Sequence, residues 1–182
     1  MYEVEVKAKL QNREEIKKKL ESLGCEFSKE LHQIDNVYFP EGLVFPPPLG
    51  TPVLRVREQN EIFIFTLKIS QSGQQDSVER ELEIKDGKMM MEIMRLLKYQ
   101  NAPTVNKTRI KAKLQGMEVV LDTVKDLGDF IEVEKIVTND NPEDRKNIQK
   151  DIADFIETLG VAKEDLLVNG KYDIMLYEKN RK

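Results

Sequence analysis

Cysteine, histidine and tryptophan are nearly or wholly missing from this chain of 182 residues. Cys25 is the only cysteine, so an intramolecular disulfide is excluded and a reducing compartment is expected. His32 is the only histidine. Within a single chain this excludes zinc sites built from His and Cys and most Ser-His or Cys-His nucleophile arrangements. Any bound metal must therefore have oxygen ligands.

Long apolar runs and extended basic runs are also lacking. No stretch approaches the roughly 18 apolar residues of a membrane span, and no basic segment followed by an apolar one opens the chain. Charged residues make up 34% of the chain and the net charge is -4, which does not favour duplex DNA as a partner. We expect a soluble cytoplasmic protein, with residues 1–182 forming one domain and neither DNA nor a membrane as partner.

Charged and apolar residues alternate at the start of the chain. Glu3, Glu5 and Lys7 alternate with the apolar residues of positions 4, 6 and 8, so an extended strand sends the two sets to opposite faces. The same alternation recurs in the predicted strands 53–59, 61–69, 77–85, 105–114, 117–122 and 130–137. Gln115 and Gly116 predict a hairpin turn between two of these strands.

Three helices are expected around these strands. Asn12 caps a predicted helix that runs to residue 23, a Met-rich helix is expected over residues 87–99, and Asn141 with Pro142 starts a third that ends near residue 160. Residues 25–39 read as an extended segment, and residues 169–177 as either a short strand or a final helical turn. In residues 40–52, a central strand is forbidden by Pro46, Pro47, Pro48, Gly50 and Pro52. Loops of this length often lie over a site.

The sign of the charges is sorted strand by strand. Residues 3–5 and 132–134 present glutamate pairs, whereas residues 55–57 and 107–109 present pairs of cations. A solvent-facing sheet normally mixes signs, because neighbouring like charges repel. If these faces point into one barrel, an acidic wall and a basic wall line it, and each needs a partner of opposite sign. A polyphosphate chelated to a divalent cation supplies both partners, because carboxylates bind Mg²⁺ or Mn²⁺ and cationic side chains bind phosphoryl oxygens.

In order and spacing, the charged residues resemble the CYTH superfamily of triphosphate tunnel metalloenzymes, most of all its class IV adenylyl cyclase branch. The matching elements are Glu3-x-Glu5-x-Lys7, Gln33-x-Asp35, Arg55-x-Arg57, Thr66-x-Lys68, Arg80 with Glu81 and Glu83, Lys107-x-Arg109, Asp122, Gly128 and Glu132-x-Glu134. The resemblance covers nearly the whole chain. It implies an α+β fold in which an antiparallel eight-stranded closed β-barrel forms a triphosphate tunnel with helices packed outside, Mg²⁺ or Mn²⁺ as cofactor, and a homodimer.

The resemblance also implies roles for single residues. Those implied to bind metal are Glu3, Glu5, Glu81, Glu83, Asp122, Glu132 and Glu134. Those implied to bind the triphosphate are Lys7, Arg55, Arg57, Lys68, Arg80, Lys107, Arg109 and Lys171. Of these, Glu3, Glu5, Lys7, Glu132 and Glu134 are expected to be catalytic.

Two positions depart from the pattern. Alternation puts Arg80 on the face opposite Glu81 and Glu83, so only one sign faces inward unless a bulge intervenes. Lys171-Tyr172 stands where the family commonly shows Ser-Tyr, although Lys171 is long enough to reach phosphate. Asp35 and Tyr38 fit the family pattern, and a structural role as strand-end hydrogen bonders is the alternative for both.

The expected chemistry is metal-dependent and acts on a triphosphate. In a cyclase the ribose 3′-hydroxyl of ATP attacks the α-phosphorus, giving cyclic AMP and pyrophosphate, whereas in a phosphohydrolase water attacks the γ-phosphorus. Nothing in the sequence marks an adenine pocket, so inorganic triphosphatase or thiamine triphosphatase activity is the alternative. A non-catalytic module that binds polyphosphate or nucleotide is a third reading, and a barrel whose charges form only surface ion pairs is the last.

Overall fold

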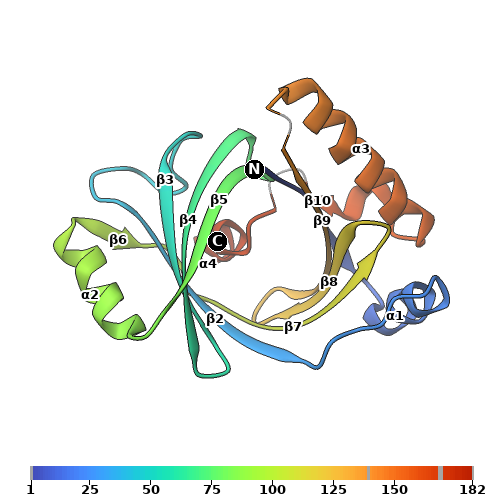
Figure 1. Cartoon of the computed structure of the whole chain (residues 1–182), viewed down its shortest axis with the longest axis horizontal. Coiled ribbons are helices and arrows are strands. Elements are labelled where there is room, and N and C mark those ends of the chain that lie inside the picture. The colour runs from blue at the N-terminus through green and yellow to red at the C-terminus, as the bar shows by residue number, and fades with distance from the viewer. Residues whose placement is uncertain (1, 139, 168–169, 182) are drawn as a thin grey trace.

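Eight antiparallel strands close into a ring of backbone hydrogen bonds in the computed structural model, which describes residues 2–138, 140–167 and 170–181 (Figure 1). Around the ring they are β1 (Tyr2–Leu10), β5 (Asp76–Ile84), β4 (Ile62–Gly73), β3 (Pro52–Gln59), β2 (Leu31–Pro40), β7 (Val105–Leu114), β8 (Met117–Val124) and β9 (Gly128–Val137), which returns to β1. Two short strands, β6 (Tyr99–Asn101) and β10 (Leu166–Leu167), pair with β2 and β1. The predicted α+β fold with a ring of eight antiparallel strands is confirmed.

The ring closes unevenly on the two sides of β1. With β9, β1 pairs along its full length, from Tyr2 opposite Val137 to Leu10 opposite Asp129. With β5, only residues 2–4 pair with residues 76–78, and β10 pairs with Lys7 and Ala8 farther along the same side. We call the short contact between β1 and β5 the seam. It is the narrowest junction between neighbouring strands of the ring.

Helices cover the outer face of the barrel. They are α1 (Arg13–Ser22), α2 (Gly87–Leu96) and α3 (Pro142–Thr158), whereas α4 (Tyr172–Asn180) lies at one end of the barrel. The predicted caps at Asn12 and Asn141 both accept a hydrogen bond from a backbone N–H in the first helical turn. The predicted Met-rich helix ends earlier than expected, because Lys98 has a positive φ of 63° and Tyr99 begins β6. None of the helices in the described part of the chain is long and apolar enough to cross a membrane.

The apolar face of β1 packs under α1 and α3. Val4, Val6 and Ala8 belong to one buried cluster with residues of both helices, among them Leu20 and Ile156. The charged residues of β1 therefore have to face the interior of the ring. Both faces of this strand are buried, which is why its polar alternation does not mark a solvent-exposed face.

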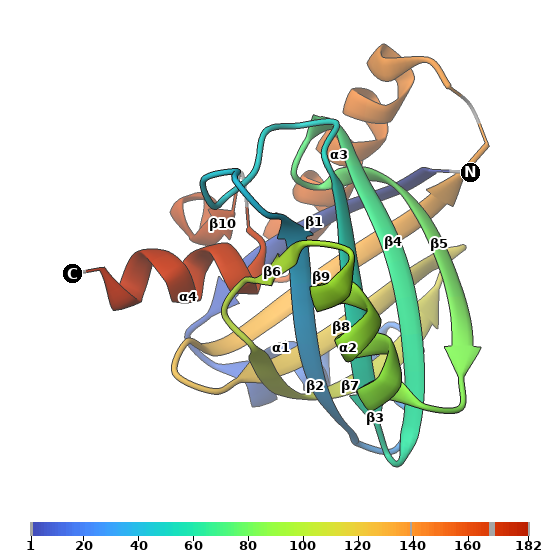
Figure 2. The same cartoon turned by 90° about the vertical axis from the view of Figure 1, so that its left-hand side faces the viewer.

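One end of the barrel is closed by α4. The expected short strand or helical turn near the C-terminus is a full helix, and residue 169, where that element was predicted to start, lies outside the described residues. Seen through the ring in Figure 1, α4 lies across its opening. Its Tyr172 and Leu176 pack against Val105 and Phe130 of the barrel. On the other side Ile174 packs against Phe45 of the loop at residues 41–51, seen above β2 in Figure 2.

A buried ion pair fastens α3 to the seam. Arg145 of α3 donates to Asp76 of β5, with 2.8 Å between Nε and Oδ1, and both side chains are 4% exposed. The Arg145 guanidinium also lies over the Tyr2 ring, 4.2 Å from its centroid. Asp76 and Tyr2 are both seam residues. This contact therefore reinforces the narrowest junction in the ring.

Replacing Arg145 should destabilise the fold. We expect Arg145→Met to lower the free energy of unfolding by roughly 3–5 kcal/mol, because it leaves the Asp76 carboxylate buried without its partner. Urea unfolding followed by far-ultraviolet circular dichroism measures this. The matched control is Lys146→Met, which removes an exposed ion pair one residue away and should change stability little. Equal losses in the two variants would contradict the role of the pair.

Candidate active site

Inward-facing side chains of the barrel line a single cavity that is crowded with charges. Along each strand, the residues that line the cavity alternate with residues of the outer face, because successive side chains of a strand point to opposite sides. Nine carboxylates and eight cations line it: Glu3, Glu5, Asp35, Glu79, Glu81, Glu118, Glu132, Glu134 and Asp173, with Lys7, Arg55, Arg57, Lys68, Lys107, Arg109, Lys111 and Lys171. The charges are thus nearly balanced before any ligand is present.

The two signs occupy opposite halves of the ring. Four neighbouring strands, β5, β1, β9 and β8, carry most of the carboxylates, and the other four, β4, β3, β2 and β7, carry most of the cations. Lys7 on β1 and Asp35 on β2 are the exceptions. The sorting of charge by strand in the sequence therefore becomes two opposed walls of one cavity.

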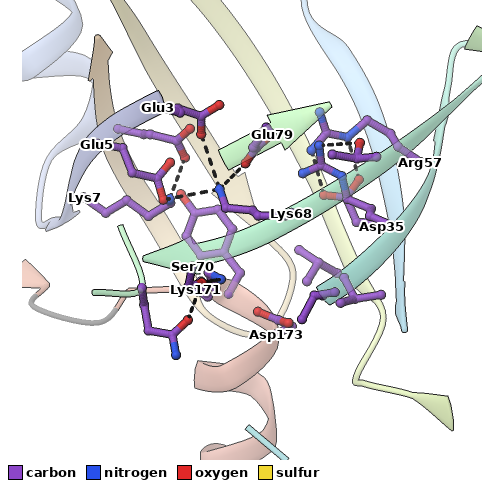
Figure 3. A pocket seen from close by; sticks show the side chains of 18 of the residues that line it. Glu3, Glu5, Lys7, Asp35, Arg57, Lys68, Ser70, Glu79, Lys171 and Asp173 are labelled. Carbon is purple, nitrogen blue, oxygen red and sulfur yellow. Dashed lines mark hydrogen bonds and ion pairs between the residues drawn. The ribbon is translucent and has the colours of Figure 1, made fainter. Parts of the chain in front are cut away.

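Lysines from both walls form ion pairs with the acidic half (Figure 3). The Lys68 ammonium lies 3.3 Å from a carboxylate oxygen of Glu3 and also pairs with Glu79. The Lys7 ammonium lies 2.7 Å from Glu5 and 3.2 Å from Glu132. The sequence suggested that a ligand supplies the counter-charges of each wall, but in the structure side chains of the barrel neutralise one another directly, Lys68 from the cationic half and Lys7 from within the acidic half. A ligand must exchange these ion pairs when it binds.

Two arginines are held by bidentate carboxylates. Arg57 donates to both oxygens of Asp35, at 2.6 and 2.9 Å. Arg109 donates to both oxygens of Asp122, at 2.7 and 2.6 Å, and also to Glu132 at 3.1 Å. Such pairs fix the orientation of a guanidinium as well as its position. Asp35 therefore has a defined place in the site, as a holder of Arg57.

Asp122 lies with the cations rather than in an acidic cluster. Its side chain is fully buried, and besides Arg109 it accepts a hydrogen bond of 3.0 Å from the Tyr172 hydroxyl. Burial opposes its ionisation, but Arg109 and Lys107 outweigh burial and hold its pKa below the ordinary value. The same holds for Glu132, whose pKa Arg109 and Lys7 keep well below the ordinary value despite burial. Asp122 thus orients Arg109 and is not part of the carboxylate cluster formed by Glu3, Glu5 and Glu134, and the metal role given to it from the sequence stays a prediction.

Glu3, Glu5 and Glu134 form the acidic cluster of the cavity. One carboxylate oxygen from each lies within 4.8 Å of the others, and the register of β1 and β9 sets Glu5 directly opposite Glu134. Burial raises the pKa of Glu3 to about 7, although Lys68 opposes it. Burial, together with the neighbouring Glu132 and Glu3 carboxylates, raises the pKa of Glu134 to about 9. A set of donors made only of carboxylate oxygens fits Mg²⁺ or Mn²⁺.

Two residues predicted for the site lie elsewhere. Arg80 is exposed on the outer face of β5 and donates to the backbone carbonyl of Glu79. The pairing of β4 with β5 is regular there, so no bulge turns Arg80 inward. Glu83 is exposed beyond the cavity, whereas Glu81 lines the cavity and pairs with Arg55 at 2.8 Å. Arg80 and Glu83 therefore drop out of the candidate site.

Several residues that line the cavity were not predicted as site residues from the sequence. Glu79 shares the alternation of Glu81, and that signal would have been sufficient to include it. Tyr172 and Asp173 reach the cavity only because α4 folds back over the barrel, which no local pattern indicates. Lys171 lines the cavity as expected and donates to the Ser70 hydroxyl at 2.8 Å. Burial and the nearby Lys68 lower the pKa of Lys171 to about 8.

Comparison with known proteins gives consistent matches. A family model described as CYTH domain matches residues 1–170. A protein of Methanocaldococcus jannaschii named "Putative adenylate cyclase" is 27% identical over 169 residues, 92% of this chain and 94% of that protein. The PH1012 protein of Pyrococcus horikoshii has a solved structure that is 31% identical, with a TM-score of 0.74 and coverage of 94% and 98% of the two chains. A Hippeastrum structure, "Putative adenylyl cyclase HpAC1", described as having a dominant triphosphatase activity, shares the fold at TM-score 0.57 and 16% identity, with coverage of 98% and 95%.

Binding of a divalent ion at the acidic cluster should depend on pH. At neutral pH the raised pKa values keep protons on Glu134 and partly on Glu3, and an ion must displace them. The apparent affinity for Mn²⁺, measured by titration calorimetry, should therefore rise between about pH 6 and pH 9, with protons released on binding. Without metal, the ionisation of Glu134 disfavours folding as pH rises from its ordinary value of 4.5 to about 9, so thermal stability should fall across this window.

Glu134→Gln should remove most of both pH dependences, because Gln carries no ionisable proton. Glu83→Gln is the matched control, since Glu83 lies on β5, another strand of the acidic half, but outside the cavity. If Glu83→Gln changes the two pH dependences as much as Glu134→Gln does, then they do not arise from titration of Glu134.

Proposed function

Because the chain belongs to the CYTH domain family, we propose that it is a divalent-metal-dependent enzyme that acts on a triphosphate inside the barrel. The leading reaction is that of a class IV adenylyl cyclase, which converts ATP to cyclic AMP and pyrophosphate. The observation that supports it most is the meeting of the acidic cluster and the cationic wall in one cavity. A single domain over residues 1–182, a homodimer and a cytoplasmic location belong to the same proposal.

The cationic half of the barrel binds the triphosphate chain. Arg55, Arg57, Lys68, Lys107 and Arg109 offer guanidinium and ammonium donors to phosphoryl oxygens, and Lys7 and Lys171 add to them from the opposite wall and from the start of α4. Arg57 and Arg109 are already oriented by Asp35 and Asp122. Little reorganisation is then needed at these two positions as the ligand enters.

The acidic half holds the divalent ion. Glu3, Glu5 and Glu134 supply its ligands, with Glu132 beside them. When bound, Mg²⁺ or Mn²⁺ neutralises phosphate oxygens and lowers the pKa of an attacking water or hydroxyl. On binding the ion, Glu3 and Glu134 would release their protons to solvent, and Lys68, no longer paired with Glu3, would be available to a phosphoryl oxygen.

Catalysis in this cavity rests on position and charge. Phosphoryl and nucleotidyl transfer require alignment of the attacking oxygen and stabilisation of the leaving oxygens, with no protein nucleophile. Cys25 packs in the apolar cluster outside the barrel, and the exposed His32 forms a hydrogen bond with Asn106. Neither side chain has a role in the proposed catalysis. In the cyclase reaction the cations stabilise charge that develops on pyrophosphate as it leaves the α-phosphorus.

A triphosphatase is the alternative supported by a specific observation. The same walls would serve attack of water on the γ-phosphorus of tripolyphosphate or thiamine triphosphate, and the Hippeastrum protein of this fold is described as mainly a triphosphatase. A module that only binds polyphosphate is less well supported, because anion binding requires the cations and gains nothing from the cluster of Glu3, Glu5 and Glu134.

Analysis of products separates the two enzymatic readings. The protein is incubated with ATP, tripolyphosphate and thiamine triphosphate in Mg²⁺ or Mn²⁺, and cyclic AMP, pyrophosphate and orthophosphate are measured. We expect cyclic AMP and pyrophosphate in equal amounts from ATP. Cleavage of tripolyphosphate without any cyclic AMP would replace the cyclase by the triphosphatase. Glu134→Gln should abolish turnover while anion binding persists, and an unchanged rate would contradict catalysis at this cluster.

Replacement of a cavity cation should lower activity far more than replacement of one outside. Lys68→Met removes an ammonium that faces three carboxylates and the proposed phosphate path, and we expect kcat/KM to fall about 100-fold or more. Arg80→Met, one strand away on the outer face, is the control and should leave kcat/KM within about twofold. Steady-state kinetics on the best substrate of the product assay provides the comparison.

A further inference from the structure

The charged cavity continues into an apolar section at the end closed by α4. Its lining consists of Val37, Phe45, Pro47, Pro48, Val53 and Val105, which we call the apolar antechamber. Three of these residues, Phe45, Pro47 and Pro48, come from the loop at 41–51, so the proline-rich loop forms part of the cavity wall. Phe45 is held in place by Phe39 and Tyr177, with both ring centroids 5.1 Å away.

Phosphate oxygens do not explain this apolar surface. A bare polyphosphate carries charge along its whole length and would lose hydration against these side chains without gaining a partner. Flat proline and aromatic surfaces instead suit a planar ring. The antechamber adjoins the cationic wall within the same cavity, so one ligand with an anionic and an apolar part can occupy both.

One carboxylate in this section has no evident use in binding phosphate. Asp173 lies in the first turn of α4, is 8% exposed and lines the same cavity, as Figure 3 shows. Burial raises its pKa although Lys171 opposes the shift, and its carboxylate bonds to backbone N–H groups of its own turn. A carboxylate has about four acceptor sites, so acceptor capacity remains toward the cavity. Its charge repels phosphate and favours a ligand that brings an N–H donor.

We propose that the antechamber binds a planar heteroaromatic group of the substrate and that Asp173 accepts a hydrogen bond from an N–H of that group. The substrate is then an organic triphosphate, such as an aminopurine nucleoside triphosphate, rather than tripolyphosphate. This inference rests on the proposed function, because the triphosphate part must lie among the cations. A site built to accept an N–H discriminates strongly against an analogue that lacks it, since the buried acceptor is then left unpaired.

Three substrates test the proposal: ATP, purine riboside triphosphate, which lacks the 6-amino group, and tripolyphosphate. For the unaltered protein we expect kcat/KM for ATP to exceed that for the analogue by about tenfold or more. Asp173→Leu should reduce this preference to within about twofold, because the 6-amino group then has no acceptor to lose. Glu178→Leu, on the exposed side of the same helix, should retain the full preference. Thr51→Trp, which fills the cavity from the loop side, should weaken ATP and the analogue together and spare tripolyphosphate.

Equal kcat/KM for ATP and its analogue in the unaltered protein would overturn the proposal. So would equal losses on all three substrates in Asp173→Leu, because that result indicates a structural role. If the protein turns over none of the three, the proposed function fails instead. Calorimetric binding of ATP and the analogue then decides this inference separately: tighter binding of ATP that Asp173→Leu abolishes supports it, and equal affinities overturn it.

Discussion

Ion pairs among the inward-facing side chains of the barrel are the interaction on which the rest of the structure depends. Lys68 and Lys7 pair with the glutamates of β1, β5 and β9, while Arg57 and Arg109 are held by bidentate aspartates. A buried ion without its partner costs several kcal/mol, so each of these charges is tolerated only because another faces it. The arrangement also prepares for exchange. A chelated phosphate chain presents both signs at once, and it can take over the partners of both walls without leaving either one uncompensated.

The barrel achieves this by burying both faces of its strands. On β1 the apolar residues lie under α1 and α3, and the charged residues point into the ring. Apolar packing outside the ring stabilises the fold, and this leaves the inner face free for chemistry. Arg145 stabilises the closure of the ring at the short seam from outside. The α3 helix therefore both packs in the apolar core and helps to keep the ring around the cavity closed.

The sequence was most informative where structure follows local alternation. The strand at 105–114, the turn at Gln115 and Gly116 and the inward face of Glu3, Glu5 and Lys7 all follow from a period of two, and the structure has them as predicted. For Arg80 the family pattern and the alternation disagreed, and the alternation was right: the regular register of β4 and β5 keeps Arg80 on the outer face. The register of the predicted hairpin also sets Arg109 opposite Asp122, so this pair could have been found from the sequence. What could not be predicted is that α4 brings Tyr172 and Asp173 over the cavity, because this depends on tertiary packing that no spacing along the chain encodes.

The pairing of β1 with β9 has a consequence for how the chain reaches this state. The first strand to leave the ribosome finds its full-length partner only in the last long strand, more than a hundred residues later. Contacts so distant in sequence make folding slow, because the entropy of a long loop is lost before the pairing is gained. Until β9 and α3 are synthesised, the glutamates of β1 have no closed lumen around them, and its valines can be covered only by α1. The pairing that closes the ring is also the one that sets Glu5 opposite Glu134, so the cluster of Glu3, Glu5 and Glu134 is complete only when the ring has closed.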